Sequence, residues 1–176
     1  MSKKILLKKT CSVYASDLHL AAMIFPFVDK EIEKGAKIKP ILEKDISSCI
    51  KKIINNVGMN LEVKKKIERV DWNQTNIDKI KETLEDIENN LKENNKIHII
   101  ISGSNLFIEK VNKLLDLWTK MKLEEIEKSN TEINIINCYR FEENESINNI
   151  LDEHEYILKT GGIEELYKNE NLKKAN

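Results

Sequence analysis

A chain of 176 residues is long enough to bury the core of one domain, and a hydrophobic fraction of 40% is typical of a globular protein. Charged residues make up 34% of the chain, but 29 lysines and arginines stand against 30 aspartates and glutamates, which leaves a net charge of −1. This balance gives no electrostatic reason to expect nucleic acid or an anionic membrane as a partner. We therefore expect neither.

The cysteines and the first residues predict a cytoplasmic protein. Cys11, Cys49 and Cys138 are odd in number, far apart and set among apolar residues, which indicates buried free thiols in a reducing compartment. The opening MSKKILLKKT has only three consecutive apolar residues, too few for the core of a signal peptide. No apolar run approaches the length of a transmembrane helix.

The first quarter of the chain predicts a strand, a helix and a second strand. A short apolar run at 11–15 leads directly into a helical pattern that Ser16 caps, and Pro26 inside this helix is expected to kink it. Residues 36–42 predict the second strand. Because Pro40 cannot donate a hydrogen bond to a neighbouring strand, we expect this strand at an edge of the sheet or at a bulge.

Three elements are expected between residues 45 and 94. Asp45 caps a second helix, residues 67–72 alternate weakly and predict a short strand, and Thr75 with Asp78 resembles a capping box for a third helix. That helix carries a narrow apolar stripe at steps of three and four, formed by Ile77, Ile80, Leu84, Ile87 and Leu91. The stripe either packs on the protein's own sheet or forms a seam for a partner helix.

The second half of the chain again alternates strand and helix. The near-continuous apolar run at 97–101 is typical of a central parallel strand covered on both faces. Residues 102–104 turn it into a long helix, 132–141 predict the next strand, and a short helix starting at Ser146 precedes a last strand at 155–159.

This alternation predicts an α/β fold. We expect a three-layer, mostly parallel sheet of five or six strands with helices on both faces, joined by right-handed crossovers. With no internal repeat and no linker, residues 1–167 form one domain in this interpretation, and 168–176 form a polar C-terminal tail.

The turn after the first strand lacks the residue types of a phosphate-binding loop. Such a loop needs glycines that free backbone amides, a lysine for the phosphates and a hydroxyl for Mg²⁺, whereas this turn reads YASDLH. The apolar strand at 97–101 ends in Ser-Gly-Ser rather than in a metal-holding carboxylate, and no GxGxxG motif is present. We predict no hydrolysis of ATP or GTP and no cofactor.

Residue patterns typical of catalysis or metal binding are also missing. The three histidines and three cysteines are scattered without a CxxC or HxxxH pattern. His98 is expected to be a hydrogen-bonded histidine of the core. Asp17 near His19 could orient an imidazole, but the helix dipole, which favours an acid in the first turn, is the preferred explanation for Asp17. We assign no catalytic residue and no metal ligand, and we do not expect an enzyme.

The carboxyl ends of the strands remain the best place for a ligand, because open parallel sheets bind ligands there. The sequence places several aromatic and polar side chains at or near these ends, together with Glu43. The candidate ligand-binding residues are Tyr14, Ser16, Asp17, Trp72, Ser102, Tyr139 and Arg140.

The order of these features resembles a known family. The segment VYASDLHLAAMIFPFVDKEIEKGAKI is similar to the opening of the MEDS domain (methanogen/methylotroph DcmR sensory domain), and INCYRFEENESINNILDEHEYIL is similar to its second half. The residues that carry the match are Tyr14, Asp17, Pro26, Phe27, Glu33, Gly35, Cys138, Tyr139, Ile150, Leu151 and His154. The likeness covers about residues 10 to 162. The stretch between Glu68 and Leu106 agrees only as a pattern of elements.

This resemblance implies a RecA/KaiC-like core that has lost its nucleotide-hydrolysing motifs and serves as a sensory input module. The family's proposed ligands are small hydrocarbon derivatives, and its members are commonly joined to an output domain. This chain has no room for one, so we expect a stand-alone sensor that acts on a partner signalling protein in trans or as a homodimer.

Two other functions stay open. The first is a protein-interaction adaptor that binds no small ligand. The second is a small-molecule transferase or hydrolase that uses Asp17, His19 or Arg140, which would require these groups to converge. A ligand-sized cavity of a few hundred Å³ would favour the sensor over the adaptor.

Overall fold

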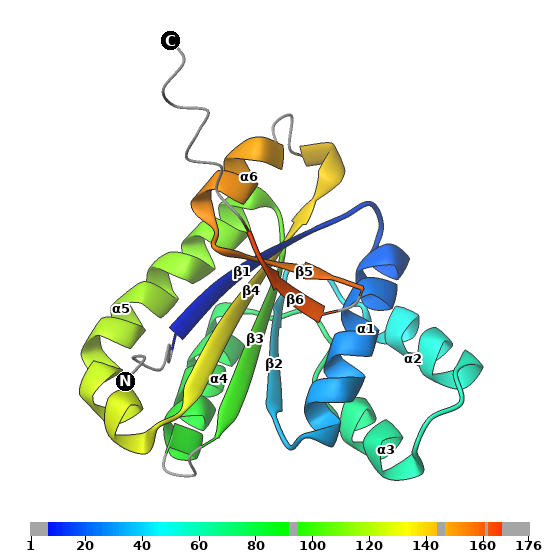
Figure 1. Cartoon of the computed structure of the whole chain (residues 1–176), viewed down its shortest axis with the longest axis horizontal. Helices are drawn as coiled ribbons and strands as arrows, with labels where there is room; N and C mark the ends of the chain where they lie inside the picture. Colours follow the sequence, from blue (N-terminus) through cyan, green and yellow to red (C-terminus); the bar gives the residue numbers. More distant parts are fainter. Residues whose placement is uncertain (1–6, 92–94, 144–146, 161, 167–176) are drawn as a thin grey trace.

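The computed structural model describes residues 7–91, 95–143, 147–160 and 162–166. Within them, a single sheet is built from six strands, β1 (Leu7–Tyr14), β2 (Lys37–Leu42), β3 (Lys96–Gly103), β4 (Glu132–Arg140), β5 (Tyr156–Lys159) and β6 (Gly162–Glu165). Their order is β2-β3-β4-β1-β5-β6, and every neighbouring pair is parallel except the β5–β6 hairpin (Figure 1). The predicted α/β fold with a mostly parallel sheet is therefore confirmed.

The described helices alternate with the first four strands. They are α1 (Asp17–Glu33), α2 (Ser47–Asn56), α3 (Leu61–Arg69), α4 (Ile77–Asn90), α5 (Asn105–Ser129) and α6 (Ile147–Glu153), with a short 3₁₀ turn at Phe141–Glu143. None of the helices in these ranges is both long and apolar enough to cross a membrane. The predicted tail at 168–176 lies outside the described residues.

Buried side chains of the strands alternate between two hydrophobic clusters, because successive residues of a strand point to opposite faces. In β3, Ile97, Ile99 and Ile101 belong to a cluster with α4 and α5, whereas Ile100 belongs to a cluster with α1, α2 and α3. Figure 1 shows the same grouping, with α4 and α5 apart from α1, α2 and α3. All four isoleucines are fully buried. The prediction of a covered strand at 97–101 is confirmed, although β4 and β1 lie nearer the middle of the sheet.

The helix α4 packs on its own sheet. Ile80, Ile87 and Leu91 are buried and Leu84 is packed against the same cluster, while Ile77 at the start of the helix is 69% exposed. The expected capping box is wrong, because the side chain of Asn76 accepts the amide of Lys79. Thr75 instead accepts the amide of Leu42 at the end of β2 through its hydroxyl, which ties the helix start to the sheet.

The strand expected at 67–72 is also wrong. Residues up to Arg69 continue α3, which the side chain of Asn60 caps at its start. Val63 and Ile67 are four residues apart on one face of this helix and both reach the core. This helical spacing of apolar residues outweighs the weak alternation between polar and apolar residues that suggested a strand.

The sequence analysis predicted one of the two edge strands of the described sheet and missed the other. The strand that contains Pro40 is an edge strand, as expected, since β2 pairs only with β3 in the described sheet. The opposite edge is β6, which was not predicted. It begins at Gly162, where the glycines seemed to end the last strand, and it pairs with β5 in antiparallel orientation.

Candidate functional site

Four of the predicted ligand-binding residues meet at the carboxyl ends of the strands. The guanidinium of Arg140, at the end of β4, lies 2.6 Å from the carboxylate of Asp17 in the first turn of α1. Its Cζ atom also lies 5.7 Å from the centre of the Tyr14 ring. The hydroxyl of Ser102 donates to the hydroxyl of Tyr14 at 3.1 Å. These side chains contact one another rather than an open space.

The start of α5, at the same edge, is occupied by the protein's own carboxylate. Both the backbone amide and the hydroxyl of Ser104 donate to Glu43, which follows β2. Gly103 makes this approach possible, since a Cβ atom there would lie 2.7 Å from the Glu43 Cβ and 2.7 Å from a ring carbon of Phe107. The place where a helix start could receive an anion is therefore filled by Glu43.

The remaining volume at this edge is small. The cavity between Tyr14, Asp17, Glu43, Ser102 and Arg140 measures about 20 Å³. That is close to the space needed by one water molecule and far below that of a small-molecule site.

Three other predicted residues do not join this group. Ser16 is exposed and accepts the amide of His19, so it serves as the cap of α1. Trp72 is buried beside α3 and donates its indole N–H to the carbonyl of Ile67 at 3.0 Å. Tyr139 belongs to the cluster of α4 and α5, where its ring meets that of His154 edge to face with 5.9 Å between their centres. Burial raises the pKa of Tyr139 to about 12.

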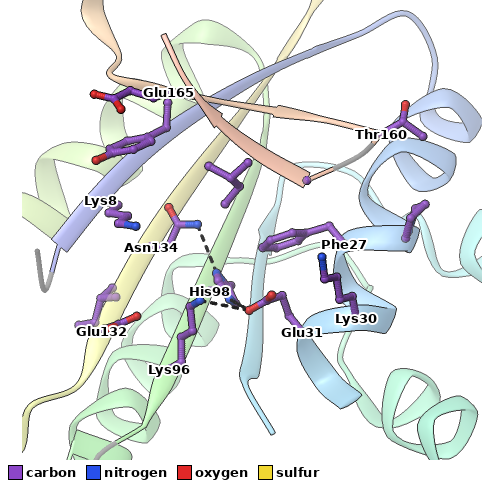
Figure 2. Close-up of a pocket in the computed structure, with 15 residues that line it drawn as sticks. Lys8, Phe27, Lys30, Glu31, Lys96, His98, Glu132, Asn134, Thr160 and Glu165 are labelled. Carbon is purple, nitrogen blue, oxygen red and sulfur yellow. Dashed lines mark hydrogen bonds and ion pairs between the residues drawn. The ribbon is translucent and has the colours of Figure 1, made fainter. Parts of the chain in front are cut away.

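A larger cavity lies on the α1 face of the sheet. It measures about 480 Å³ and is bounded by the second half of α1, the β5–β6 hairpin and the strands β1, β3 and β4 (Figure 2). Pro26 and Phe27 line it from α1, and Tyr156 and Ile163 line it from the hairpin. We refer to this cavity as the hairpin groove. Its volume is within the range of small-molecule sites.

Three buried polar residues that line the hairpin groove, Glu31, His98 and Asn134, belong to a hydrogen-bonded chain that continues to Thr10. The hydroxyl of Thr10 donates to the side-chain carbonyl of Asn134 at 2.9 Å, and the amide of Asn134 lies 3.3 Å from Nδ1 of His98. The other ring nitrogen, Nε2, lies 2.9 Å from the carboxylate of Glu31. If Nε2 carries the proton, Nδ1 can accept from Asn134, so a neutral imidazole satisfies every bond in the chain.

Charge in this network is concentrated on Glu31. Hydrogen bonding to His98 holds the pKa of the Glu31 carboxyl well below its usual range, and Lys34 and Lys96 act in the same direction. Lys34 and Lys96 place their ammonium groups 2.9 and 3.4 Å from this carboxylate. Burial is the largest influence on His98 and lowers its pKa, although Glu31 opposes that shift. The lowered pKa of Glu31 favours its ionised form and the lowered pKa of His98 favours its neutral form, so the pair is an ionised carboxylate beside a neutral imidazole.

Basic and acidic side chains alternate around the opening of the groove. Lys8, Lys30 and Lys96 line it together with Glu132 and Glu165. The Lys8 ammonium lies 5.2 Å from the centre of the Tyr156 ring. The groove thus offers aromatic and aliphatic walls with charged groups of both signs at the rim.

A second groove of about 530 Å³ runs along the edge strand β2, between α3 and α4. Half of its lining residues are charged and exposed or half-buried, among them Lys37, Lys66, Lys79, Glu82 and Asp86. Among its charged residues, none has the deep burial of Glu31 and His98. We therefore regard the hairpin groove as the better candidate site.

Comparison with known proteins adds no relative: no family model matches the chain, and no curated protein is significantly similar to it. In the part of the chain that the structure describes, no group of three or more His, Cys, Asp or Glu side chains could hold a metal ion.

The sequence identified His98 correctly as a hydrogen-bonded core residue but did not identify its partner. Glu31 follows Phe27 by four residues, so the two share the buried face of α1. A glutamate on an apolar helix face is unusual and was the signal available for this site. Asn134, whose side chain completes the network, gave no such signal.

Proposed function

We propose that this protein is a non-catalytic sensory module that binds a small ligand in the hairpin groove and transmits the signal to a partner protein. The hairpin groove is the observation that carries the proposal. It offers about 480 Å³, against about 20 Å³ at the carboxyl ends of the strands. The sequence analysis expected the ligand at the carboxyl ends of the strands. We now propose that it binds on the α1 face of the sheet.

The lining of the groove favours a molecule with an apolar body and a polar or charged end. Phe27 and Ile163 provide apolar contact, while Lys8, Lys30 and Glu165 lie at the rim. This composition is typical of small-molecule sites, in which a few polar groups orient a ligand held between apolar walls. A hydrocarbon derivative with a polar substituent fits it better than a pure hydrocarbon does.

Binding is favoured over catalysis because the titratable groups of the site are engaged with one another. Both oxygens of Glu31 have partners, and both ring nitrogens of His98 do as well. The buried cysteines are poor nucleophiles, since burial raises the pKa of Cys11 to about 11 and that of Cys138 to about 12. Free thiols of this kind also support a cytoplasmic location.

We further propose that the fold is a three-layer, RecA-like arrangement and that the chain is related to the MEDS domain. The two hydrophobic clusters on opposite sides of the strands support the first part. For the second, Pro26 and Phe27, which belong to the resemblance, both line the hairpin groove.

An adaptor that binds no small ligand is the alternative. The filled strand ends favour it, because the place where open parallel sheets usually bind ligands is closed by the Arg140–Asp17 and Glu43–Ser104 contacts. For the enzyme hypothesis, Asp17 and Arg140 do converge, but as an ion pair, while the His19 ring accepts the amide of Ala15.

Native mass spectrometry of protein purified from its own host tests the proposal. We expect a retained small molecule that is lost in an Ile163→Trp variant, which fills the groove, but kept in Ile77→Trp, a change at an exposed position of α4. Retention in both variants would place the ligand elsewhere. Absence of any retained mass, together with no amide shifts for Asn134 or Ile163 during NMR screening of small molecules, would favour the adaptor.

A further inference from the structure

The lysines around the hairpin groove differ in whether they already have an acidic partner. Lys34 and Lys96 place their ammonium groups 2.9 and 3.4 Å from the carboxylate of Glu31. Lys8 and Lys30 line the same groove, and in the part of the chain that the structure describes neither has a carboxylate within 4 Å. These two ammonium groups are therefore available to an anionic ligand.

Lys30 stands on the α1 side of the groove, beside its aromatic wall. Pro26 and Lys30 are four residues apart and both are exposed, so they form an outer row along α1. Phe27 and Glu31 form the neighbouring row, which is buried. Phe27 and Lys30 are three residues apart and hence neighbours on the helix surface, as Figure 2 shows. A molecule that packs against Phe27 can thus bring a charged end to Lys30.

Lys8 lies on the other side of the cavity, where an acidic residue accompanies it (Figure 2). Its ammonium lies 5.2 Å from the centre of the Tyr156 ring, and Tyr156 is the register partner of Glu165 in the β5–β6 hairpin. The charges of Lys8 and Glu165 are therefore placed around the same tyrosine and offset each other. This leaves Lys30 as the better position for the charged end of a ligand.

The groups around the groove carry one more positive than negative charge. The described lining contains three acidic and three basic residues, Glu31, Glu132, Glu165, Lys8, Lys30 and Lys96. Lys34, outside the lining, adds a fourth ammonium group because it binds Glu31. A ligand with a single negative charge balances this set. A phosphate monoester, with a charge of about −1.5 to −2 at neutral pH, exceeds it.

We propose that the ligand of the hairpin groove is a small carboxylic acid, whose carboxylate binds the ammonium of Lys30 and whose apolar body packs against Phe27 and Ile163. This inference rests on the proposed sensory function and adds the chemical class of its ligand. A carboxylate supplies the single negative charge and accepts charge-assisted hydrogen bonds from an ammonium group. The cavity of about 480 Å³ has room for an aromatic or branched aliphatic acid.

Three probes of similar shape and different charge test the class of ligand. Phenylacetate, neutral phenylacetamide and cationic 2-phenylethylammonium are titrated into the isotope-labelled full chain at neutral pH, and the amide shifts of Asn134 and Ile163 report binding in the groove. We expect phenylacetate to bind about tenfold more tightly than phenylacetamide, because the amide lacks the charge that the ammonium group attracts. The cationic probe should bind more weakly than either.

Substitution of Lys30 tests the position of the carboxylate. Lys30→Gln should raise the dissociation constant of phenylacetate about tenfold and leave that of phenylacetamide nearly unchanged, whereas Lys30→Arg should keep the preference for the acid. The matched control is Lys120→Gln, the same change of charge at an exposed position of α5 outside the groove, which should alter neither constant. Circular dichroism checks that each variant stays folded.

Four results would overturn the proposal. They are binding of phenylacetamide or 2-phenylethylammonium as tight as that of phenylacetate, a preference for the acid that persists in Lys30→Gln, no shift of Asn134 or Ile163 with any probe up to about 20 mM, and tighter binding of phenyl phosphate. In each case a molecule that native mass spectrometry finds in wild type but not in Ile163→Trp leaves the sensory function intact. The two proposals can therefore fail separately.

Discussion

Glu31 of α1 and His98 of β3 meet across the α1 face of the sheet with 2.9 Å between Oε2 and Nε2. They are 67 residues apart in sequence, and both side chains are more than nine-tenths buried. The pair links the helix to an interior strand below the hairpin groove. Both residues also line the groove, so the contact joins α1 to β3 at the wall of this cavity.

Neutralising this carboxylate should destabilise the protein. Glu31→Gln weakens charge-assisted hydrogen bonds with His98 and Lys34, and we expect the free energy of unfolding to fall by about 1–3 kcal/mol. The matched control is Glu33→Gln, a change on the exposed face of the same helix, for which we expect less than about 0.5 kcal/mol. Urea unfolding followed by circular dichroism measures both. If the two variants lose the same free energy of unfolding, the buried Glu31–His98 pair adds no stability beyond that of an exposed glutamate.

Stability should decrease as the pH is lowered, in two ranges. The pKa of His98 is lowered in the folded state, so below about pH 6.5 the unfolded chain takes up a proton that the folded chain excludes. The pKa of Glu31 is also lowered, and its contribution is lost further down, below about pH 4.5. Thermal unfolding of His98→Asn should show a weaker dependence between pH 7 and 5 than wild type. An identical dependence would contradict the assignment of a neutral His98.

The glycine before α5 should resist substitution. An alanine at Gly103 would bring its Cβ to 2.7 Å from Glu43 and Phe107, and we expect a loss of about 1–3 kcal/mol in the free energy of unfolding. Gly58→Ala is the control, because nothing lies within 4 Å of the added atom, and the unfolded chain loses entropy. We expect that variant to be as stable as wild type or more stable by up to about 1 kcal/mol.

The apolar residues of α4 that contact the sheet should be essential for folding rather than for association with a partner. A charged residue in place of Leu84 would lie in the hydrophobic cluster with Ile80 and Ile87, so Leu84→Asp should cost about 2–4 kcal/mol of stability. Ile77→Asp changes an exposed member of the same stripe and should be tolerated. If Leu84→Asp stays fully folded and changes only the oligomeric state, the apolar side of α4 packs against a partner helix instead.

Calorimetry with Mg-ATP should detect no micromolar binding. The carboxylate of Glu43 accepts the Ser104 amide at the start of α5, so an incoming phosphate would have to displace it and overcome its charge. The turn before α1 has no lysine to compensate. Micromolar affinity for Mg-ATP would refute this interpretation of the strand ends.

Local patterns were enough to predict most of the fold. The buried run at 97–101, the cap at Ser16 and the proline of the edge strand each depend on neighbours in sequence, and each has its expected role. Residues 67–72 were misinterpreted because charged residues obscured the helical spacing of Val63 and Ile67. The strand β6 was missed because the glycines seemed to end the last strand, whereas Gly162, with a φ of +122°, is the first residue of β6.

The candidate site was less predictable. The sequence correctly grouped Tyr14, Asp17, Ser102 and Arg140 at one edge of the sheet, but it could not show that these side chains fill the space between them. The hairpin groove depends on contacts between α1 and residues more than 100 positions later, including Tyr156 and Ile163. Such a cavity has no local signature, so only the buried Glu31 pointed toward it.

The two edge strands of the described sheet, β2 and β6, affect the solubility of the protein at high concentration. At one end, Pro40 in β2 lacks the N–H that a further strand would need for a regular ladder. At the other, β6 is four residues long and ends in the exposed carboxylates of Glu164 and Glu165. In natural sheets, both features hinder the edge strands from pairing with strands of other molecules. Replacing Pro40 by valine would therefore promote aggregation even if the isolated fold became more stable.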